Sequence, residues 1–472
     1  MRALLLASLS ALALTAPAFA QNAPVFDEDT IATARELMDD GLDSDLAYAL
    51  VEDLTTRIGP RLAGSDAEAR AREWSVTTLK ALGFDAVRVE PFDVPYWERR
   101  VERGAITAPA PQNLVLTALG GSVGTGPGGI EAQIVRFETL GDLRAAPESA
   151  LEGKIAFVDE YTRRTQDGSG YGVGVAKRRE AAELAEARGG LAAMIRSVGT
   201  QHRRLAHTGQ MRRIGEPQAG VPAVALSPPD ADQLGRLLEL GPVTVKLDVE
   251  VETLTAAPSG NVVGEITGSE RPEEIVLVGG HLDSWDLGTG AIDDGAGVAI
   301  TTAAAKMIID AGLKPKRTIR VVHFGSEEVG LVGARAYAQQ HADTLKNHIV
   351  GAESDFGAGE IWRLTPNFGA EDWTVLRDAM LEVIGPLGVG PGPNSGTGGP
   401  DMSFVRQAGV PVISFTQNGW DYIDLQHPPD DTLDKIDPEA LAQNVAVYAA
   451  FLWLVANSDV NFRAEPDAAL GD

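Results

Sequence analysis

The chain has 472 residues, and its 40 basic and 67 acidic side chains give a formal net charge of −27. An acidic surface repels phosphate backbones and anionic lipids, so we expect neither a nucleic acid nor a membrane as a partner. The length allows more than one domain, and the absence of cysteine excludes disulfides and thiolate metal ligands.

The first twenty residues are predicted to be a signal peptide. Arg2 is followed by an apolar run over 3–14, and residues 18–20 read Ala-Phe-Ala, which is a small-residue cleavage signal. We therefore expect export to the periplasm or the extracellular space, with a retained N-terminal anchor as the alternative. No later apolar run is expected to approach the roughly 20 residues that a membrane helix needs.

Residues 21–112 are predicted to form an N-terminal segment and the first part of the main domain. Apolar residues at helical spacing predict helices over 45–58 and 67–82, and alternation predicts a strand over 86–94.

A change of composition marks residues 113–255, which we predict to be an inserted β-rich domain. Gly-rich turns separate several of its short strands and its two helices. The strands are expected at 114–116, 131–136, 154–158, 191–195, 223–226 and 243–251, and the helices at 177–187 and 229–240.

After a break at 256–260, residues 256–460 are predicted to form the main part of the larger domain. Strands are expected at 261–266, 275–279, 318–324, 348–353 and 410–415, and helices at 297–311, 329–340 and 438–456. This alternation predicts an α/β fold with a mixed, mostly parallel sheet sandwiched by helices. Residues 461–472 are expected to be a flexible tail.

Acidic and imidazole side chains follow several predicted strands of this domain. Ligands of open α/β sheets gather beyond the carboxyl ends of the strands, and a mixture of imidazoles and carboxylates is typical of a hydrolytic metal site. The set consists of His281, Asp293, Glu327, Glu328, Asp355 and His427.

Each of these residues also has an ordinary structural interpretation. Asp293 could cap the helix that begins there, although Asp294 could do so instead. Glu327 and Glu328 could be acids in the first turn of a helix, and they serve one site only if the backbone turns, which Gly325 allows. His281 and His427 could be loop or surface residues.

Five segments carry a resemblance to a known family. At these segments the chain resembles the co-catalytic di-zinc exopeptidases of the bacterial leucyl aminopeptidase and glutamate carboxypeptidase superfamily, and within it the carboxypeptidase Q group. The segments are 56–65, 280–286, 291–295, 324–330 and His427 with 431–432. The resemblance implies the zinc exopeptidase fold and identifies the inserted block as a protease-associated domain.

The resemblance also implies a site that holds two Zn²⁺ ions per chain. Its metal ligands would be His281, Asp293, Glu328, Asp355 and His427. Asp293 would bridge the two ions, Glu327 would be the general base, and Asp283 would orient the ring of His281 through its second nitrogen.

By the same resemblance, His281 and Asp355 would complete the binding site of one zinc ion, and Glu328 and His427 would complete that of the other. The expected activity is hydrolysis of dipeptides or short peptides through a metal-bridging hydroxide, with a homodimer as a further expectation.

Three residues near the site have roles that stay open. Tyr422 is a candidate oxyanion donor, and Asp401 either receives a substrate amine or caps a helix. Gln426 stands where relatives often place a second histidine before the ligand, which bears on the substrate pocket and not on the metal ligands.

Two alternatives belong to other classes of function. Residues 120–124 match the G-x-S-x-G pattern of a serine hydrolase with Ser122 as nucleophile, but the Gly-Pro-Gly-Gly run at 126–129 makes a following helix improbable. A non-catalytic, peptidase-like binding protein is the second alternative, and such proteins typically lose metal ligands.

Overall fold

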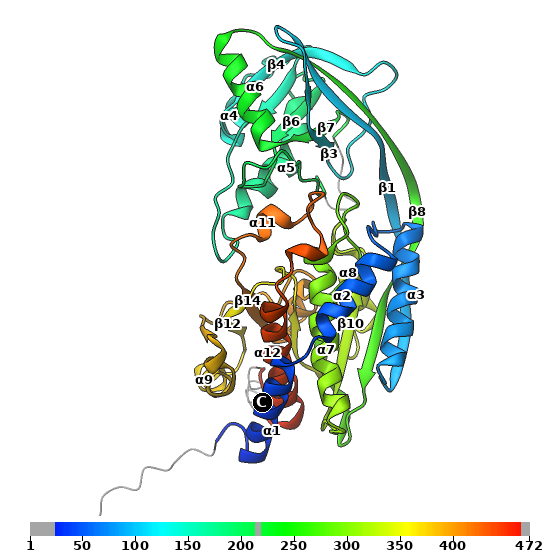
Figure 1. Cartoon of the computed structure of the whole chain (residues 1–472), viewed down its shortest axis with the longest axis vertical. Helices are drawn as coiled ribbons and strands as arrows, with labels where there is room; N and C mark the ends of the chain where they lie inside the picture. Colours follow the sequence, from blue (N-terminus) through cyan, green and yellow to red (C-terminus); the bar gives the residue numbers. More distant parts are fainter. Residues whose placement is uncertain (1–23, 213–218, 464–472) are drawn as a thin grey trace, which may run out of the picture.

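The computed structural model describes residues 24–212 and 219–463, which form two bodies stacked along the long axis (Figure 1). The lower body contains both ends of the described chain, and the upper body contains its middle. Two long antiparallel strands, β1 (Ala86–Ala108) and β8 (Thr244–Ile266), run along one side and join the bodies. The predicted signal peptide, 1–20, lies outside the described residues.

The lower body is built on a mixed sheet with the strand order β13-β12-β14-β11-β9-β10-β8. Parallel pairing joins β14, β11, β9 and β10 in its centre, whereas β8 and β12 pair antiparallel with their neighbours β10 and β14. The mixed α/β fold is therefore confirmed. The bounds are β9 (Arg271–His281), β10 (Arg317–Phe324), β11 (His348–Glu353), β12 (Ile361–Asn367), β13 (Gly390–Pro391) and β14 (Val412–Gln417).

Helices cover both faces of this sheet. Val276 and Val278 of β9 pack into the core on one face, whereas Ile275 and Leu277 pack into the core on the other, because side chains alternate along a strand. The first face carries α1 (Glu28–Leu42), α2 (Leu46–Arg57), α3 (Asp66–Ala81), α7 (Ala296–Asp310), α9 (Trp373–Ile384) and α12 (Pro438–Asn457). The second carries α8 (Val332–Gln340) and α10 (Ser403–Gln407).

Helix α12 is long and apolar enough to cross a membrane by length and composition. The expectation that no later apolar run approaches that length is therefore wrong. In this structure, 94% of the most apolar window of α12 is buried, and the helix packs against α1 and α7 at the centre of the lower body. Burial on all sides explains why its sequence lacks a polar face.

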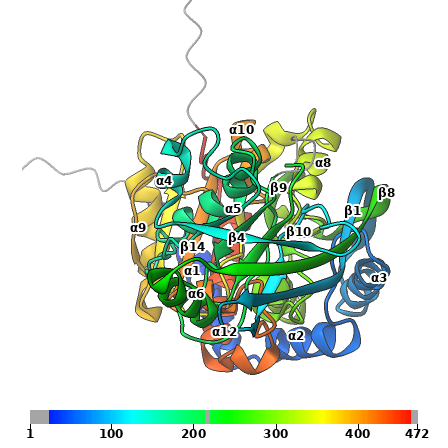
Figure 2. The ribbon, with the colours of Figure 1, turned by 90° about the horizontal axis from the view of Figure 1, so that it is seen from above.

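The upper body has a smaller sheet of order β4-β5-β6-β7-β3, which continues the main sheet because β4 also pairs with β8. Helices α4 and α5 cover one side of it, and α6 covers the other (Figure 2). The strands are β2 (Gln112–Leu114), β3 (Leu116–Ala118), β4 (Ile130–Phe137), β5 (Ile155–Val158), β6 (Ala192–Arg196) and β7 (Ala223–Leu226). The helices are α4 (Leu140–Ala145), α5 (Tyr171–Glu186) and α6 (Pro228–Leu240).

One prediction about the chain path is wrong. The break at 256–260 does not exist, because β8 runs through it and pairs with β1, with Pro258 opposite Asp93. Residues 252–256 are exposed in this two-stranded ribbon and therefore lack the pattern of a buried strand. Of the predicted flexible tail, Phe462 is buried against Phe368, while 464–472 lie outside the described residues, so the flexibility of the tail stays a prediction.

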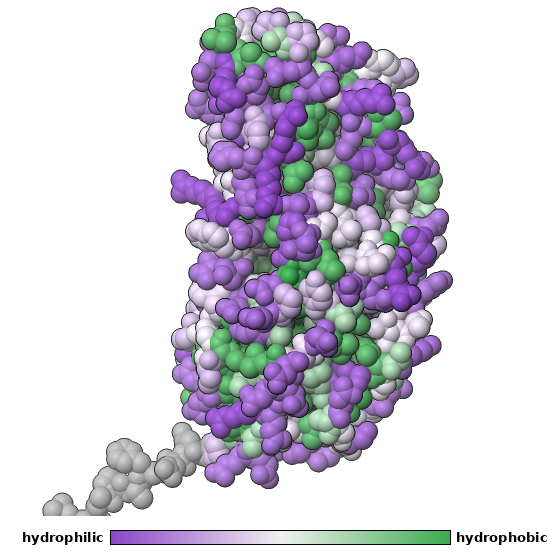
Figure 3. All heavy atoms as spheres, in the orientation of Figure 1, coloured by the Kyte–Doolittle hydropathy of each residue, from purple (hydrophilic) through white to green (hydrophobic). Residues whose placement is uncertain are grey.

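One face of the molecule can be described by its hydropathy. On the face shown in Figure 3, hydrophilic residues predominate and hydrophobic residues form scattered patches between them. This distribution agrees with the acidic composition of the chain.

Candidate metal centre

His281 is the last residue of β9, at the carboxyl edge of the lower sheet. Its ring is buried, and Nδ1 lies 2.9 Å from the backbone carbonyl oxygen of Asp283. The carboxylate of Asp283 is farther away, at 3.7 Å, and accepts hydrogen bonds from the backbone N–H groups of Glu327 and Glu328. Asp283 therefore orients His281 through its carbonyl group, while its side chain holds the loop that carries the two glutamates.

Asp293 lies in the turn before α7, and the side chain of its neighbour Asp294 bonds to the backbone of the first turn of α7. Asp294 accepts hydrogen bonds from the N–H of Gly297 in α7 and from the N–H of His281. Asp293 is thereby left to face the two imidazoles. Neither aspartate is the N-cap residue of α7, which is Gly295, although Asp294 bonds to the first turn of the helix.

Glu327 and Glu328 follow β10, and the backbone does turn between the strand and these residues. The turn occurs at Ser326, whose φ is 60°, and not at Gly325, which was expected to permit it. Gly325 is needed for a different reason: a Cβ atom there would lie 2.7 Å from the carbonyl oxygen of Gly260 in β8. The predicted turn is present, but its residue and its physical cause differ.

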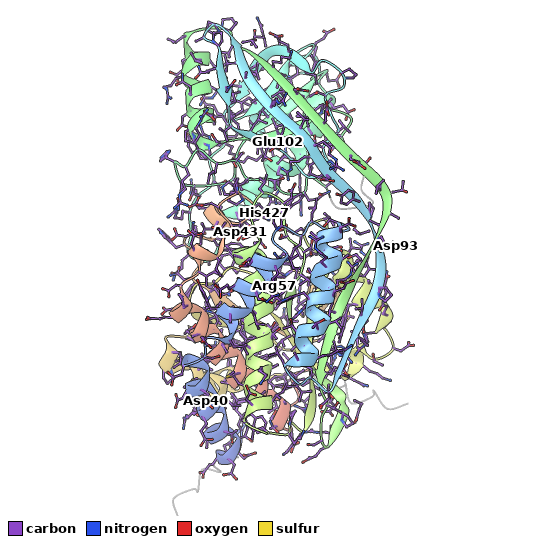
Figure 4. The ribbon with its side chains drawn as sticks, turned by 45° about the vertical axis from the view of Figure 1, so that its right-hand side comes forward. Asp40, Arg57, Asp93, Glu102, His427 and Asp431 are labelled. Atoms are coloured by element: carbon purple, nitrogen blue, oxygen red, sulfur yellow. The ribbon has the colours of Figure 1, made fainter. Side chains whose placement is uncertain are left out.

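Asp355 lies just beyond β11, and His427 follows the short helix α11 (Tyr422–Leu425). His427 adopts a φ of 68°, a left-handed conformation that is uncommon for residues other than glycine. In Figure 4, His427 and Asp431 lie at the level where the upper and lower bodies meet.

These segments bring the five expected ligands together as two groups of three that share Asp293. One oxygen of Asp293 lies 2.9 Å from Nε2 of His281, which is also 3.8 Å from Asp355. The other oxygen of Asp293 lies 3.1 Å from Nε2 of His427, which is also 3.1 Å from Glu328. Within each group, the potential ligand atoms lie within 4.8 Å of one another.

The donor set fits divalent metal ions. Nε2 of each imidazole faces carboxylate oxygens while Nδ1 faces a backbone carbonyl, so a cation could take the place of the Nε2 proton. One carboxylate oxygen of Glu328 is buried without a hydrogen-bond partner, which is the expected state of a ligand atom. Nitrogen and oxygen donors of this type suit zinc.

The electrostatics of the buried site also favour cations. Burial and the neighbouring carboxylates raise the pKa of Glu327 to about 8. Burial opposes the charged form of His281, but its hydrogen bond to Asp293 and the charge of Asp355 raise its pKa well above the ordinary value. Burial would raise the pKa of Asp293, but hydrogen bonds from His281 and His427 lower it instead.

Several supporting residues were not assigned a role from the sequence. Asp431 accepts hydrogen bonds from the N–H groups of Ile292 and Asp293, and Trp285 donates from Nε1 to Glu328 at 2.6 Å. Asp431 and Trp285 lie inside the segments that carried the resemblance, so that pattern was the available signal. The contacts that Thr208 and Arg178 of the upper body make with His427 had no such signal in the sequence.

A cleft of about 500 Å³ opens at the site, between the two bodies. Glu327, Asp355, His427 and Tyr422 line it, and the hydroxyl of Tyr422 lies 3.4 Å from Asp355.

Asp401 is fully buried and does not line this cleft. It does not cap α10, and its backbone N–H donates to Glu353 at 2.7 Å. Both interpretations of Asp401 are therefore unsupported among the described residues.

Ser122 does not have the surroundings of a nucleophile. Its side chain is buried in the upper body, where the hydroxyl donates to the carbonyl of Val123 and accepts from the N–H of Ala223. Both bonds are to backbone groups, which explains Ser122 as a structural residue of a glycine-rich turn.

Comparisons with known proteins point to one family. Residues 261–452 match the model of peptidase family M28. Carboxypeptidase Q from Bos taurus is 35% identical over 421 residues, which cover 87% of this chain and 85% of that protein. The crystal structure of a peptidase M28 precursor from Shewanella amazonensis has a TM-score of 0.90 and 48% identity, covering 93% of this chain and 99% of that one. A zinc aminopeptidase from Bacillus subtilis shares the fold, with a TM-score of 0.67, 22% identity, and coverage of 88% and 96%.

Proposed function

The chain belongs to peptidase family M28, and from this premise we propose that it is a zinc-dependent exopeptidase that hydrolyses dipeptides or short peptides. The observation that carries the proposal is the pair of ligand groups that share Asp293, with Glu327 beside them on the wall of the cleft. One relative of this chain is named a carboxypeptidase and another is named an aminopeptidase, and these names refer to opposite ends of a peptide. The names therefore do not indicate which end of a peptide this chain attacks.

In the proposed site, His281 and Asp355 would hold one zinc ion, Glu328 and His427 would hold a second, and Asp293 belongs to both groups of potential ligands. Two bound ions would activate water, polarise the scissile carbonyl and stabilise the charge that develops on its oxygen. The remaining steps belong to residues of the chain.

Glu327 is the proposed general base. Its N–H is fixed by the carboxylate of Asp283, and its side chain lines the cleft, so it can take a proton from the attacking water and transfer it to the leaving amine. Nearby cations would favour its ionised form, which burial alone disfavours. Tyr422 lines the same cleft and is a proposed donor to the developing oxyanion.

The wall of the cleft supports a substrate that carries a carboxylate. Beyond the ligands and Glu327, the described lining contains four arginines, namely Arg178, Arg179, Arg212 and Arg406, whereas Asp167 is the one further acid. This is unusual in a chain with a net charge of −27. Arg212 forms an ion pair with Glu183, whereas among the described residues Arg178 and Arg406 have no carboxylate within ion-pair distance. The free carboxylate of a short peptide would provide a negative partner.

The decisive experiment compares free, N-acetylated and C-amidated dipeptides, each assayed with and without a chelator. We expect the free dipeptides to be hydrolysed and chelation to abolish turnover reversibly. Hydrolysis of the acetylated but not the free dipeptides would eliminate the requirement for a free amine. Activity that survives complete metal removal, together with labelling by a serine-directed probe, would favour a serine hydrolase instead.

The role of Glu327 has its own test. Glu327→Gln should reduce kcat by about 10²–10⁴-fold while metal analysis still finds both ions, because the amide cannot accept the proton. Glu371→Gln, at an exposed position, removes the same charge and should leave kcat unchanged. Normal turnover by the Glu327 variant would exclude it as the base.

Two further proposals concern location and assembly. Export to the periplasm or the extracellular space follows from the N-terminal sequence pattern and accords with the precursor status of the Shewanella relative. A homodimer is also proposed, and analytical ultracentrifugation of the mature chain would test it.

A further inference from the structure

The upper body contacts the candidate metal ligand His427 directly. Nδ1 of His427 lies 3.2 Å from the backbone carbonyl oxygen of Thr208, a residue 219 positions earlier in the chain. Arg178 of α5 donates to the same carbonyl at 3.3 Å. A carbonyl oxygen can only accept a hydrogen bond, so a hydrogen on Nδ1 is needed to bond Thr208, and this tautomer presents Nε2 to Asp293 and Glu328. Arg178, which can only donate, lies farther from Nδ1, at 3.5 Å.

The approach at this contact is as close as the backbone allows. Gly209, next to Thr208, has a φ of 134°, and a Cβ atom there would lie 2.9 Å from Nδ1 of His427 and 2.1 Å from Arg178. A larger residue would therefore displace either the histidine or the arginine.

A second contact holds the chain just before His427. The carboxylate of Asp424 in α11 is buried and accepts hydrogen bonds from three groups of the loop after β6. These are the N–H of Thr200 at 2.5 Å, its hydroxyl at 2.8 Å and the N–H of Gln201 at 2.9 Å. Arg164, also in the upper body, completes the set with an ion pair.

Further contacts lie on either side of His427. The ring of His207 is buried, which lowers its pKa to about 4, and its Nδ1 lies 3.0 Å from the carbonyl of Gln426. On the other side, Arg203 forms an ion pair with Asp430. The segment from Asp424 to Asp430 is thus bound to the upper body at several points along its length.

We propose that the upper body is a structural part of the second metal group, and that Asp424 is the positioning residue through which it holds His427 in place. The proposal rests on the proposed function, in which His427 binds zinc. The left-handed backbone of His427 is strained for a residue other than glycine, and it persists only when the surroundings impose it. The contacts with Thr208 and Asp424 provide that constraint, because they fix the ring and the preceding helix to a separate body.

The proposal predicts an effect on one metal group only. His281 and Asp355 follow strands of the lower sheet, so their positions do not depend on the loop after β6. Loss of the Asp424 contacts should therefore weaken the group of Asp293, Glu328 and His427 and leave the other group intact.

Asp424→Asn tests this, because an amide NH₂ group cannot accept all four donors. Asp421→Asn is the matched control: it removes the same charge from the residue preceding α11, where the side chain is exposed and pairs with Arg164 at the surface. We expect calorimetric Zn²⁺ titration to show one of two sites weakened by about 10–100-fold in Asp424→Asn and neither in the control. Gly209→Ala should weaken the same site.

A second measurement separates this proposal from the proposed function. In the metal-free protein, hydrogen–deuterium exchange of residues 418–430 should be faster in Asp424→Asn than in Asp421→Asn, whether or not the wild type proves to bind zinc. Failure of the wild type to bind zinc would overturn the proposed function and, with it, the metal role of the contact.

Two other results would overturn the positioning role alone. One is an Asp424→Asn variant with two unchanged zinc affinities and unchanged exchange. The other is equal weakening of both sites with a large fall in Tm, which would indicate general destabilisation. If Asp424→Asn does not fold, Arg164→Met, which removes one of the four donors from a partly exposed position, takes its place in the same measurements.

Discussion

Replacement of Arg61 by methionine should destabilise the protein more than any exposed charge change. The guanidinium group is completely buried, and it donates to the carbonyl groups of Leu282, Thr289 and Gly290 at 2.5, 2.7 and 2.8 Å. These carbonyls belong to the loops that carry His281 and Asp293. Arg61 therefore connects the segment after α2 to the metal centre through hydrogen bonds to backbone carbonyl groups, and not through bonds to the expected metal ligands.

The expected loss follows from the groups left without partners. Methionine fills much of the volume but donates no hydrogen bond, so the carbonyls of Leu282, Thr289 and Gly290 lose this donor, at about 1–3 kcal/mol for each one that is buried. Burial lowers the pKa of Arg61 but neighbouring aspartates, Asp431 first, favour its charged form, so the cation also balances buried negative charge. Because these terms are not additive, we expect a net loss of about 3–5 kcal/mol in the free energy of unfolding.

Urea denaturation of the metal-free protein, followed by tryptophan fluorescence, measures this change from the shift in midpoint. Arg57→Met is the control, since Arg57 is exposed and forms a surface ion pair with Asp53; it should change the stability by less than about 0.5 kcal/mol. A loss below about 1 kcal/mol for Arg61→Met would refute the reasoning that this residue satisfies otherwise unpaired carbonyls.

Three other substitutions give distinct outcomes. Gly297→Ala should lower Tm strongly, because its Cβ would lie 1.7 Å from the carbonyl oxygen of Ser354, whereas Gly172→Ala, with open space around it, should not; equal Tm values would contradict the close packing. Burial lowers the pKa of His323 to about 3, so the unfolded chain binds an extra proton between pH 6.5 and 3, and the free energy of unfolding falls as the pH falls through that window. His323→Gln should reduce this slope by up to about 1.4 kcal/mol per pH unit in pH-dependent urea denaturation, and an unchanged slope would show that the histidine is not buried in neutral form. Ser122→Ala should retain full peptidase activity, and its loss would revive the serine hydrolase alternative.

Much of the lower body could be predicted from the sequence because local patterns determine it. The apolar run at 275–278 indicated a strand buried on both faces, and helical spacing indicated α3 and α7. The order of the motifs then named the ligand candidates, which the fold brings within 4.8 Å of one another in each group. Helix α1 was missed. The prediction divided β8 in two because its exposed ribbon residues carry no hydrophobic pattern.

The sequence by itself determined which residue types stand at the carboxyl ends of the strands, since alternation and motif order are properties of neighbouring residues. Only the tertiary structure decided how they are held. It placed the turn at Ser326 and set the carbonyl oxygen of Asp283 against Nδ1 of His281. It also brought the carbonyl oxygen of Thr208 to Nδ1 of His427, a residue 219 positions later in the chain. Such contacts depend on chain closure between two bodies, and no local pattern along the sequence encodes which distant carbonyl will meet which ring.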